Sequence, residues 1–284
     1  MNNYNIYAFS DEASFDMDKQ IAALKRNGLC GPEIRFVDGP SIVDITLDKA
    51  KEVRKKLDAN GLRVWTLGSP IGKIKLVEDS FEEHLEKLKH ILEVGNILGA
   101  ENIRMFSFFL PEKSNFDDYA NEVIDKVGKM AEITIKAGIH PCHENEKAIF
   151  GDTAERCMKL LTELPILEGI FDPANFIQCG QDTMEAWRML NPFIKYLHIK
   201  DAFADGSVVP AGKGIGRVPE IVADYVKKGG KCFTVEPHLT VFSGLDSLET
   251  GDKKSGVGIY KYPDSDTAFD VACNSLKEIL NNIK

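Results

Sequence analysis

The chain has 284 residues, of which 43% are hydrophobic and 28% are charged, as in an ordinary soluble globular protein. Its 35 basic and 44 acidic residues give a net charge of −9, which argues against a nucleic-acid partner because binding to a phosphate backbone requires clustered Lys and Arg. No segment approaches the roughly 18 apolar residues of a membrane span, and the amino-terminal residues lack the basic region and apolar core of a signal peptide. We therefore predict a cytoplasmic protein with no nucleic-acid or membrane partner.

Short segments rich in β-branched and aromatic residues alternate along the chain with amphipathic segments of helical spacing. The clearest helical patterns lie at 81–98, 120–134 and 269–283. The predicted strands, in chain order, are Asn5–Phe9, Glu33–Val37, Arg63–Leu67, Asn102–Phe108, Ile139–His143, Glu168–Phe171, Tyr196–Ile199 and Cys232–Val235.

This alternation predicts an α/β protein with parallel strands, because a helix must return the chain across the sheet between parallel neighbours. Eight units fit a closed (β/α)8 TIM barrel better than an open sheet, and the length suits a single barrel domain over residues 1–284. No G-x-G-x-x-G motif follows the first strand, which weakens a dinucleotide-binding interpretation. A stretch at about 240–266, rich in Gly, Ser, Asp and Lys, predicts a loop insertion at the barrel mouth; a lid, an oligomer contact and a plain surface insertion all fit it.

Active sites of such barrels lie at the carboxyl ends of the strands. Four consecutive predicted strands end in side chains that can bind a metal: Glu144, Asp172, His198 and Glu236. Three converging carboxylates would repel one another and tend to protonate, and a divalent cation removes that problem. Three oxygen donors and one imidazole favour Mn²⁺ or Mg²⁺, with Co²⁺ and Zn²⁺ as alternatives.

Each of these residues also has a structural interpretation. A single acid at a strand end is more often a helix cap or an ion-pair partner, and His198 alone fits a packed core histidine. Four such residues in series at equivalent positions favour the metal site instead.

Five short motifs carry a resemblance to a known family: His143–Asn145, Phe171–Asn175, His198–Asp201, Ala211–Gly214 and Glu236–His238. Together they resemble the sugar phosphate isomerase/epimerase superfamily, the xylose isomerase-like TIM barrels that include ketose 3-epimerases and endonuclease IV. The resemblance implies that the four strand-end residues bind the metal and that the two glutamates among them also move the substrate proton. It further implies a small carbohydrate substrate and a homo-oligomer.

The implied reaction is isomerisation or epimerisation of a sugar, sugar phosphate or polyol through a metal-stabilised enediolate. A proton next to a carbonyl is lost at neutral pH only if the developing negative charge is stabilised, which a bound metal achieves. Carboxylates on opposite faces, Glu144 and Glu236, would then remove one proton and return another. The chain departs from the ketose 3-epimerases at Asn175, where those enzymes carry a substrate-contacting histidine.

Five further residues are candidates for substrate contact. Asn175 follows the strand-six aspartate, Lys200 points to the same side as His198, and Arg217 lies in the loop after strand seven. His238 lies beyond Glu236 and would orient it or contact substrate. Trp65 would line the pocket or fill a core layer, and Arg217 equally fits an exposed loop arginine.

Glu33 and Arg35 alternate with apolar neighbours on the second predicted strand, so both face one side. A structural pair inside the barrel is the favoured interpretation, with substrate contact as the alternative.

Other functions stay open. A metal-dependent lyase, dehydratase or C-glycoside-cleaving subunit acting on oxidised sugars or inositol-like rings would use the same chemistry. An endonuclease IV-type nuclease fits less well, because it needs a histidine-rich zinc site and the chain carries a net charge of −9. A sugar-binding barrel without activity is weakened by the complete set of four ligands.

Overall fold

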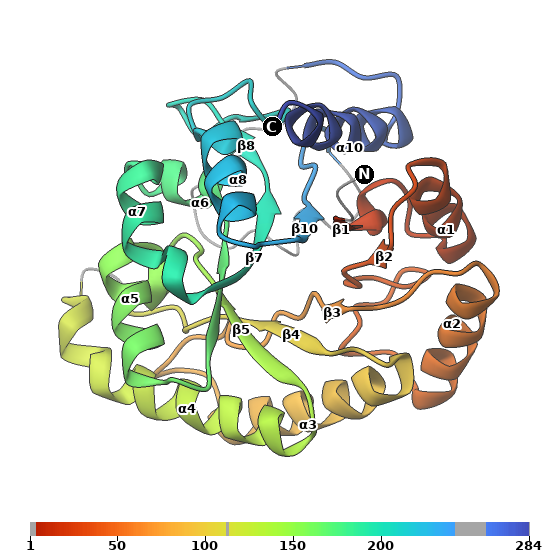
Figure 1. Cartoon of the computed structure of the whole chain (residues 1–284). Coiled ribbons are helices and arrows are strands. Elements are labelled where there is room, and N and C mark those ends of the chain that lie inside the picture. Colours follow the sequence, from red (N-terminus) through yellow and green to blue (C-terminus); the bar gives the residue numbers. More distant parts are fainter. Residues whose placement is uncertain (1–3, 112–113, 242–259, 284) are drawn as a thin grey trace.

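The computed structural model describes residues 4–111, 114–241 and 260–283, and its central feature is a sheet of eight parallel strands. The strands follow the order β2-β1-β10-β7-β6-β5-β4-β3 around the barrel (Figure 1). Their bounds are β1 Asn5–Ala8, β2 Gly31–Pro32, β3 Thr66–Leu67, β4 Asn102–Met105, β5 His140–Glu144, β6 Glu168–Phe171, β7 Ile194–Ile199 and β10 Cys232–Val235. Ile34, just after β2, forms a parallel bridge with Leu67 of β3, so the barrel nearly closes. The predicted (β/α)8 TIM barrel is confirmed.

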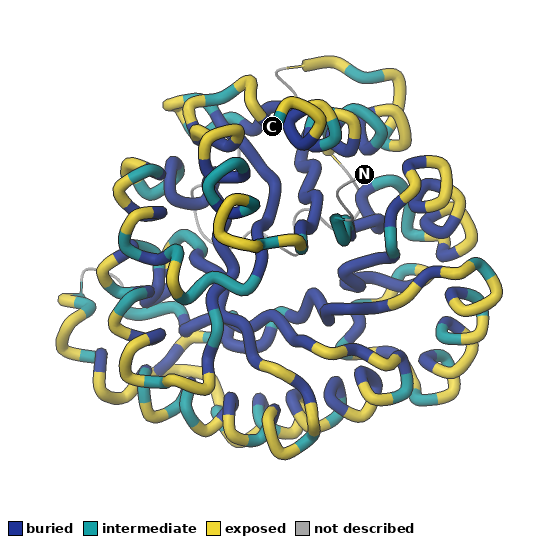
Figure 2. Tube along the Cα trace, in the orientation of Figure 1, coloured by how far each residue is buried: buried dark blue, intermediate teal, exposed yellow. Residues whose placement is uncertain are grey.

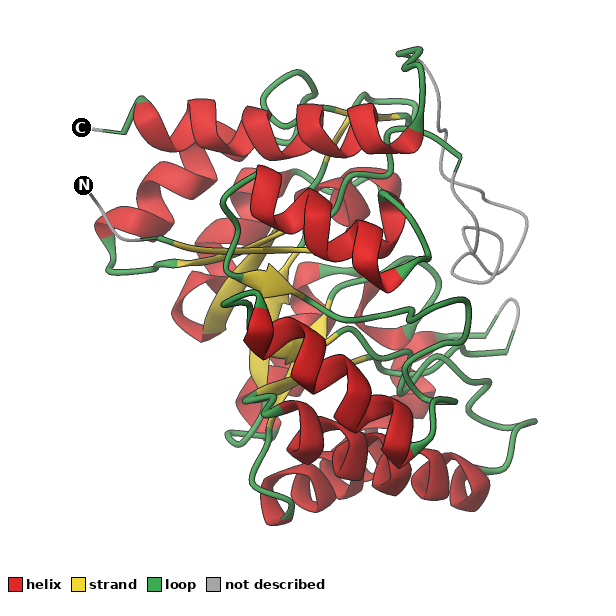
Figure 3. Ribbon diagram, turned by 90° about the vertical axis from the view of Figure 1, so that its right-hand side faces the viewer, coloured by secondary structure: helices red, strands yellow, loops and turns green. Residues whose placement is uncertain are grey.

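Helices surround this barrel, and their outward faces are exposed while the strands are buried (Figures 2 and 3). The helix bounds are α1 Met17–Arg26, α2 Leu47–Ala59, α3 Phe81–Leu98, α4 Ala120–Lys136, α5 Ala154–Glu163, α6 Pro173–Gln178, α7 Thr183–Leu190, α8 Val218–Lys227 and α10 Ser265–Asn281. Short 3-10 turns lie at Ser10–Glu12, Phe116–Tyr119, Phe150–Asp152 and Asn191–Phe193, and a small antiparallel hairpin pairs β8 Asp201–Ala202 with β9 Val208–Val209.

The helix α3 shows how the sequence produces this arrangement. The Ser80 hydroxyl accepts a hydrogen bond from the Glu83 backbone N–H, which caps the first turn, and Gly99 ends the helix with a φ of 73°. Between them Leu88, Leu92 and other apolar side chains of one helix face are buried against the barrel. None of the helices that the structure describes is long and apolar enough to cross a membrane.

The second strand differs from its prediction at Glu33–Val37, because β2 is Gly31–Pro32. The Glu33 backbone N–H still bonds the Ala8 carbonyl, but Ile34 already exchanges backbone bonds with the β3 segment. Beyond it, Phe36 turns back to pair with Ser41. The chain therefore crosses from one neighbouring strand to the other within four residues, which leaves no regular ladder over the predicted range.

Most of the loop insertion predicted at about 240–266 falls on residues 242–259, which lie outside the described residues. Its carboxyl-terminal part includes the first residues of α10, which begins at Ser265.

Candidate metal centre

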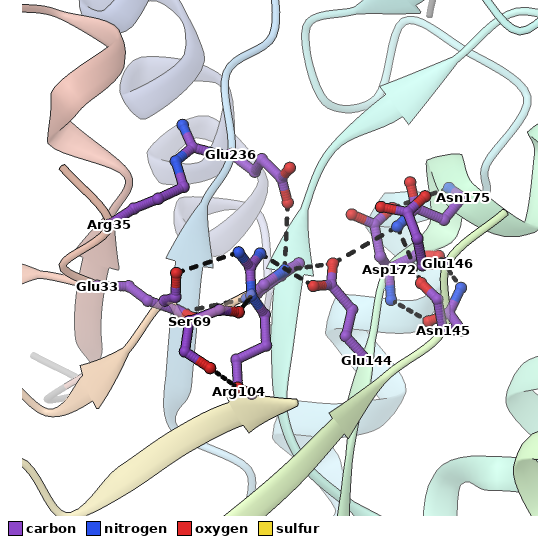
Figure 4. Close-up of polar contacts among 12 residues, drawn as sticks. Glu33, Arg35, Ser69, Arg104, Glu144, Asn145, Glu146, Asp172, Asn175 and Glu236 are labelled. Carbon is purple, nitrogen blue, oxygen red and sulfur yellow. Dashed lines mark hydrogen bonds and ion pairs between the residues drawn. The ribbon is translucent and has the colours of Figure 1, made fainter. Parts of the chain in front are cut away.

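Four buried side chains from neighbouring strands meet at the carboxyl end of the barrel. Glu144 is the last residue of β5, Asp172 directly follows β6, His198 lies in β7, and Glu236 directly follows β10. One potential ligand atom from each side chain lies within 4.8 Å of those of the other three. Figure 4 shows the three carboxylates directed toward a common space. The structure thus brings together the four residues that the sequence predicts as metal ligands.

The imidazole of His198 lies at the centre of this cluster. Its Nδ1 atom is 2.8 Å from Glu144 Oε1 and 3.2 Å from Glu236 Oε2. Its Nε2 atom faces the other way, 3.1 Å from Glu33 Oε2. Only Nδ1 therefore faces the carboxylates of the predicted ligand set.

The orientation of Asp172 is set by the backbone that follows β6. Its Oδ1 atom accepts a hydrogen bond from the Asn175 backbone N–H and caps α6. The side-chain amide of Asn145 bonds both the backbone N–H and the backbone carbonyl of Asp172, at 2.9 Å each. With Oδ1 used by the cap, Oδ2 is the oxygen left to face the cluster.

Two buried cations lie against the carboxylates. Lys200 Nζ is 3.1 Å from both Asp172 Oδ2 and Glu236 Oε1. Arg104, in β4, places Nη1 3.0 Å from Glu144 Oε2, and its other guanidinium nitrogens donate to the carbonyls of Gly68 and Ser69. Each carboxylate of the cluster therefore has at least one cationic neighbour.

Burial and these charges act in opposite directions on the carboxyl groups. Burial raises the pKa of Glu144, but His198 and Arg104 outweigh it and hold the pKa at about 2. Burial likewise opposes ionisation of Glu236, yet Lys200 and neighbouring histidines lower its pKa well below the usual range. For Asp172 the effect of burial exceeds that of the Lys200 ammonium, and the like charges of Glu236 and Glu144 add to the effect of burial, so the pKa of Asp172 rises to about 7.

The pKa of His198 is raised well above its usual range, because the carboxylates of Glu144 and Glu33 outweigh the effect of burial. The protein alone thus needs a proton on this imidazole to balance the surrounding negative charge. A divalent cation at Nδ1 would supply that balance without the proton.

The chemistry of the donor set fits a hard divalent cation. Among the residues that the structure describes, Asp172 Oδ2 and Glu236 Oε2 are buried without a hydrogen bond of good geometry, although Lys200 and His198 approach them. Buried carboxylate oxygens without such a hydrogen bond can still coordinate a cation. Three carboxylates and one imidazole match the oxygen-rich sets of Mg²⁺ and Mn²⁺, and they also accommodate Zn²⁺.

Three of the five predicted substrate residues lie beside this cluster. Lys200 contacts two of its carboxylates, and Asn175 Nδ2 lies 3.5 Å from Glu144 Oε1 while it donates to the Asn145 carbonyl. His238 Nδ1 lies 3.4 Å from Glu236 Oε1. These placements agree with the predicted positions, and contact with a substrate stays a prediction.

The other two candidates lie elsewhere. Arg217 is exposed and pairs with Glu220 at 2.7 Å, at the start of α8, so the structure favours the exposed loop arginine. Trp65 directly precedes β3, at the amino-terminal end of the barrel, where its Nε1 donates to Glu101 and its ring stacks on Tyr7. Of the two interpretations of Trp65, the structure favours a core layer, because the side chain is buried in a cluster with Tyr7 and Tyr196 and the residue precedes its strand rather than ending it.

Glu33 and Arg35 do face the interior, as expected, but they do not pair with each other. Arg35 bonds Asp11 and Glu12, both buried, while Glu33 contacts His198 and the Tyr196 hydroxyl. The Glu12 carboxylate in turn accepts a 2.6 Å hydrogen bond from the His238 backbone N–H.

Sequence reasoning missed Arg104, Asp11 and Glu12 near the site. Asp11 and Glu12 follow β1 almost directly, so the strand-end rule applied to the first strand would have found them. Arg104 could have been found as the one charged residue in the strand predicted at Asn102–Phe108, since a charged residue in a buried strand requires a partner.

Comparison with known proteins decides the family. The model of the xylose isomerase-like TIM barrel family matches residues 21–237. The chain belongs to this family. No curated protein matches its sequence.

Solved structures of similar fold cover nearly all of the chain at low identity. L-ribulose 3-epimerase matches with a TM-score of 0.74 and 18% identity, covering 100% of this chain and 96% of that one. The IOLI protein with a binding zinc atom matches with a TM-score of 0.75 and 14% identity, covering 99% of both chains. The probable 3-DHS dehydratase AsbF of Bacillus anthracis matches with a TM-score of 0.70 and 17% identity, covering 99% and 100%. At these sequence identities the similar structures establish the shared fold alone. Membership of the family rests on the match of the family model to residues 21–237.

Proposed function

We propose that the chain is a divalent-metal-dependent enzyme that isomerises or epimerises a small carbohydrate by moving a proton at the carbon beside a carbonyl group. One observation carries this proposal. Glu144 and Glu236, from different strands, both approach His198 Nδ1 within a buried cluster that also includes Asp172. The family and its L-ribulose 3-epimerase neighbour support the same reaction class.

The four clustered residues would hold the cation, with Mn²⁺ or Mg²⁺ as the proposed metal. A bound divalent cation supplies positive charge that stabilises negative charge developing on a substrate carbonyl oxygen.

The two glutamates would carry the proton. Their lowered pKa values keep both ionised at neutral pH, so either can act as the accepting base. One ionised glutamate would remove the proton beside the carbonyl and become protonated. The other glutamate, ionised at rest, would first take up a proton from solvent and would then return it to the opposite face, and release of the abstracted proton to solvent would restore the enzyme. Return to the same carbon gives an epimer, and return to the neighbouring carbon gives an aldose–ketose isomer.

Lys200, Asn175 and His238 are the proposed substrate-binding residues, since each lies within 3.5 Å of a glutamate oxygen of the cluster. An amide at Asn175 can bond a sugar hydroxyl as donor or acceptor. Lys200, held charged between two carboxylates, can donate to a hydroxyl that displaces one of them.

Elimination of water is the second candidate reaction, and Lys200 is the observation that favours it. Elimination develops negative charge on the departing hydroxyl, and this buried ammonium beside Asp172 and Glu236 can stabilise that charge by donating a hydrogen bond, while solvent supplies the proton of the released water. The fold shared with the probable 3-DHS dehydratase AsbF is consistent with this reaction.

Solvent deuterium exchange tests the proposal. The protein is loaded with Mn²⁺, incubated with a panel of ketoses and polyol-derived ketones in deuterated water, and the products are analysed by NMR after metal removal. We expect deuterium at one carbon and a new epimer or isomer, with each rate lowered about 100-fold or more in Glu144→Gln and Glu236→Gln.

Glu86→Gln is the matched control, because it makes the same change at an exposed glutamate of α3 that pairs with Lys89, and it should retain full turnover. Glu236→Gln with the wild-type exchange rate would refute the proton-transfer roles. Loss of water without an epimer or isomer would favour elimination.

A further inference from the structure

Glu33 is a fully buried acid that contacts the back of the imidazole of His198. Its Oε2 atom lies 3.1 Å from His198 Nε2, on the side of the ring away from the predicted metal ligands. Its other oxygen, Oε1, accepts a hydrogen bond from the Tyr196 hydroxyl at 3.1 Å. Both carboxylate oxygens of Glu33 are therefore used within the barrel, and neither belongs to the ligand cluster.

The imidazole is fixed in orientation by its surroundings as well as by these contacts. The rings of Phe9 and Tyr196 pack edge-on against it, with centroid distances of 5.3 and 5.4 Å. A flip of the ring would exchange its two nitrogens and break the contacts of Nδ1 with Glu144 and of Nε2 with Glu33. The contacts at both ring nitrogens therefore fix one orientation of the imidazole.

The two nitrogens of an imidazole have different tasks at a metal site. A nitrogen that carries a proton cannot bind a cation, and the hydrogen bond made by one nitrogen decides which tautomer is present. A carboxylate that accepts the Nε2 proton keeps that proton in place and makes Nδ1 the more basic nitrogen.

We propose that Glu33 is a positioning residue of the metal centre: it holds the His198 proton on Nε2 so that the imidazole binds the cation through Nδ1. Tyr196 supports it by donating to the other oxygen of Glu33. This inference rests on the proposed metal site, and it assigns to the residue directly after β2 a part in a centre whose ligands lie in or directly after β5, β6, β7 and β10.

Titration with Mn²⁺ alone tests this role without any substrate. Calorimetry on the metal-free protein should show that Glu33→Gln binds Mn²⁺ about 10- to 100-fold more weakly than the wild type. Tyr196→Phe leaves the His198 contact intact and should weaken binding less. Asp11→Asn is the matched control, because it removes a buried carboxylate that bonds Arg35 and not His198, and its Mn²⁺ affinity should change less than about threefold.

NMR provides the second measurement, which needs no variant that could fail to fold. In the wild-type protein loaded with diamagnetic Mg²⁺ or Zn²⁺, ¹⁵N spectra should show a slowly exchanging proton on His198 Nε2 and none on Nδ1. Triple-resonance assignment of the wild-type protein identifies the His198 ring signals, so no substitution is needed.

The outcomes separate the two proposals. If the wild type binds neither Mn²⁺ nor Mg²⁺ nor Zn²⁺, the metal site itself is refuted. If the wild type binds metal but Glu33→Gln binds it equally well, or if the loaded imidazole carries its proton on Nδ1, the role of Glu33 is refuted and the metal site stands.

Discussion

Arg104 and Glu144 form a buried ion pair across neighbouring strands, with Arg104 Nη1 3.0 Å from Glu144 Oε2. The guanidinium also lies over the rings of Phe9 and Phe106, at 4.9 and 5.0 Å from their centroids. Glu144 thereby keeps its charge inside the barrel while its other oxygen faces His198.

Removal of this arginine should destabilise the protein strongly. Arg104→Met leaves Glu144 without its guanidinium partner, and breaking one side of a buried pair costs about 3–5 kcal/mol of unfolding free energy. Urea unfolding of the metal-free protein measures this. Arg217→Met, which breaks an exposed pair with Glu220, should cost less than about 1 kcal/mol. Equal effects of the two substitutions would contradict the structural role given to Arg104.

Lys200→Met should change stability and metal affinity in opposite directions. The ammonium balances Asp172 and Glu236 when no metal is bound, so the metal-free variant should unfold at lower urea concentration. The same ammonium repels a divalent cation at the cluster, so the variant should bind Mn²⁺ about tenfold more tightly or better. Calorimetry gives the affinity, and weaker Mn²⁺ binding by the variant would show that Lys200 does not compete with the metal.

Metal should stabilise the folded protein by mass action. With free Mn²⁺ at about 100 times its dissociation constant, the unfolding free energy should rise by about 2.7 kcal/mol, and a chelator should reverse the rise. Asp172→Asn removes one charged ligand and should abolish most of this dependence. A wild-type melting temperature that is the same with Mn²⁺ and with chelator would argue against the site.

The convergence of the four strand-end residues could be predicted from the sequence because a barrel places the carboxyl ends of its parallel strands at one rim. To predict these residues, it was enough to locate the carboxyl ends of the strands, which short apolar segments mark well. The residues are Glu144, Asp172, His198 and Glu236. Trp65 was predicted near the end of its strand because the sequence does not show where backbone pairing with the neighbouring strand begins. In the structure β3 begins at Thr66, so Trp65 precedes the strand.

Contacts between strands distant in sequence could not be predicted in this way. The contact of Glu33 with His198 joins the segment directly after β2 to β7 across the barrel interior, and it depends on side-chain length and rotamer. No spacing along the chain encodes it. The pairing of Arg35 with Asp11 and Glu12, rather than with Glu33, likewise follows from the turn after β1.

Away from the metal centre, His84 should make stability dependent on pH. Its Nε2 atom accepts a hydrogen bond from the Gly72 backbone N–H at 2.8 Å, which requires the neutral ring. Burial, with a smaller contribution from Lys87, lowers the pKa of His84 from 6.5 to about 4. Between these two values the unfolded chain binds a proton that the folded protein excludes, so this contribution to stability is present above pH 6.5 and is lost as the pH falls toward 4.

The lost contribution amounts to at most about 3 to 4 kcal/mol, given about 1.4 kcal/mol per pKa unit. His84→Gln removes the titrating group while its side-chain oxygen can still accept from Gly72. Urea unfolding from pH 7 to pH 4.5 should therefore show a shallower loss of stability in His84→Gln than in the wild type. Parallel pH profiles for the two proteins would mean that His84 is protonated in the folded state as readily as in the unfolded chain.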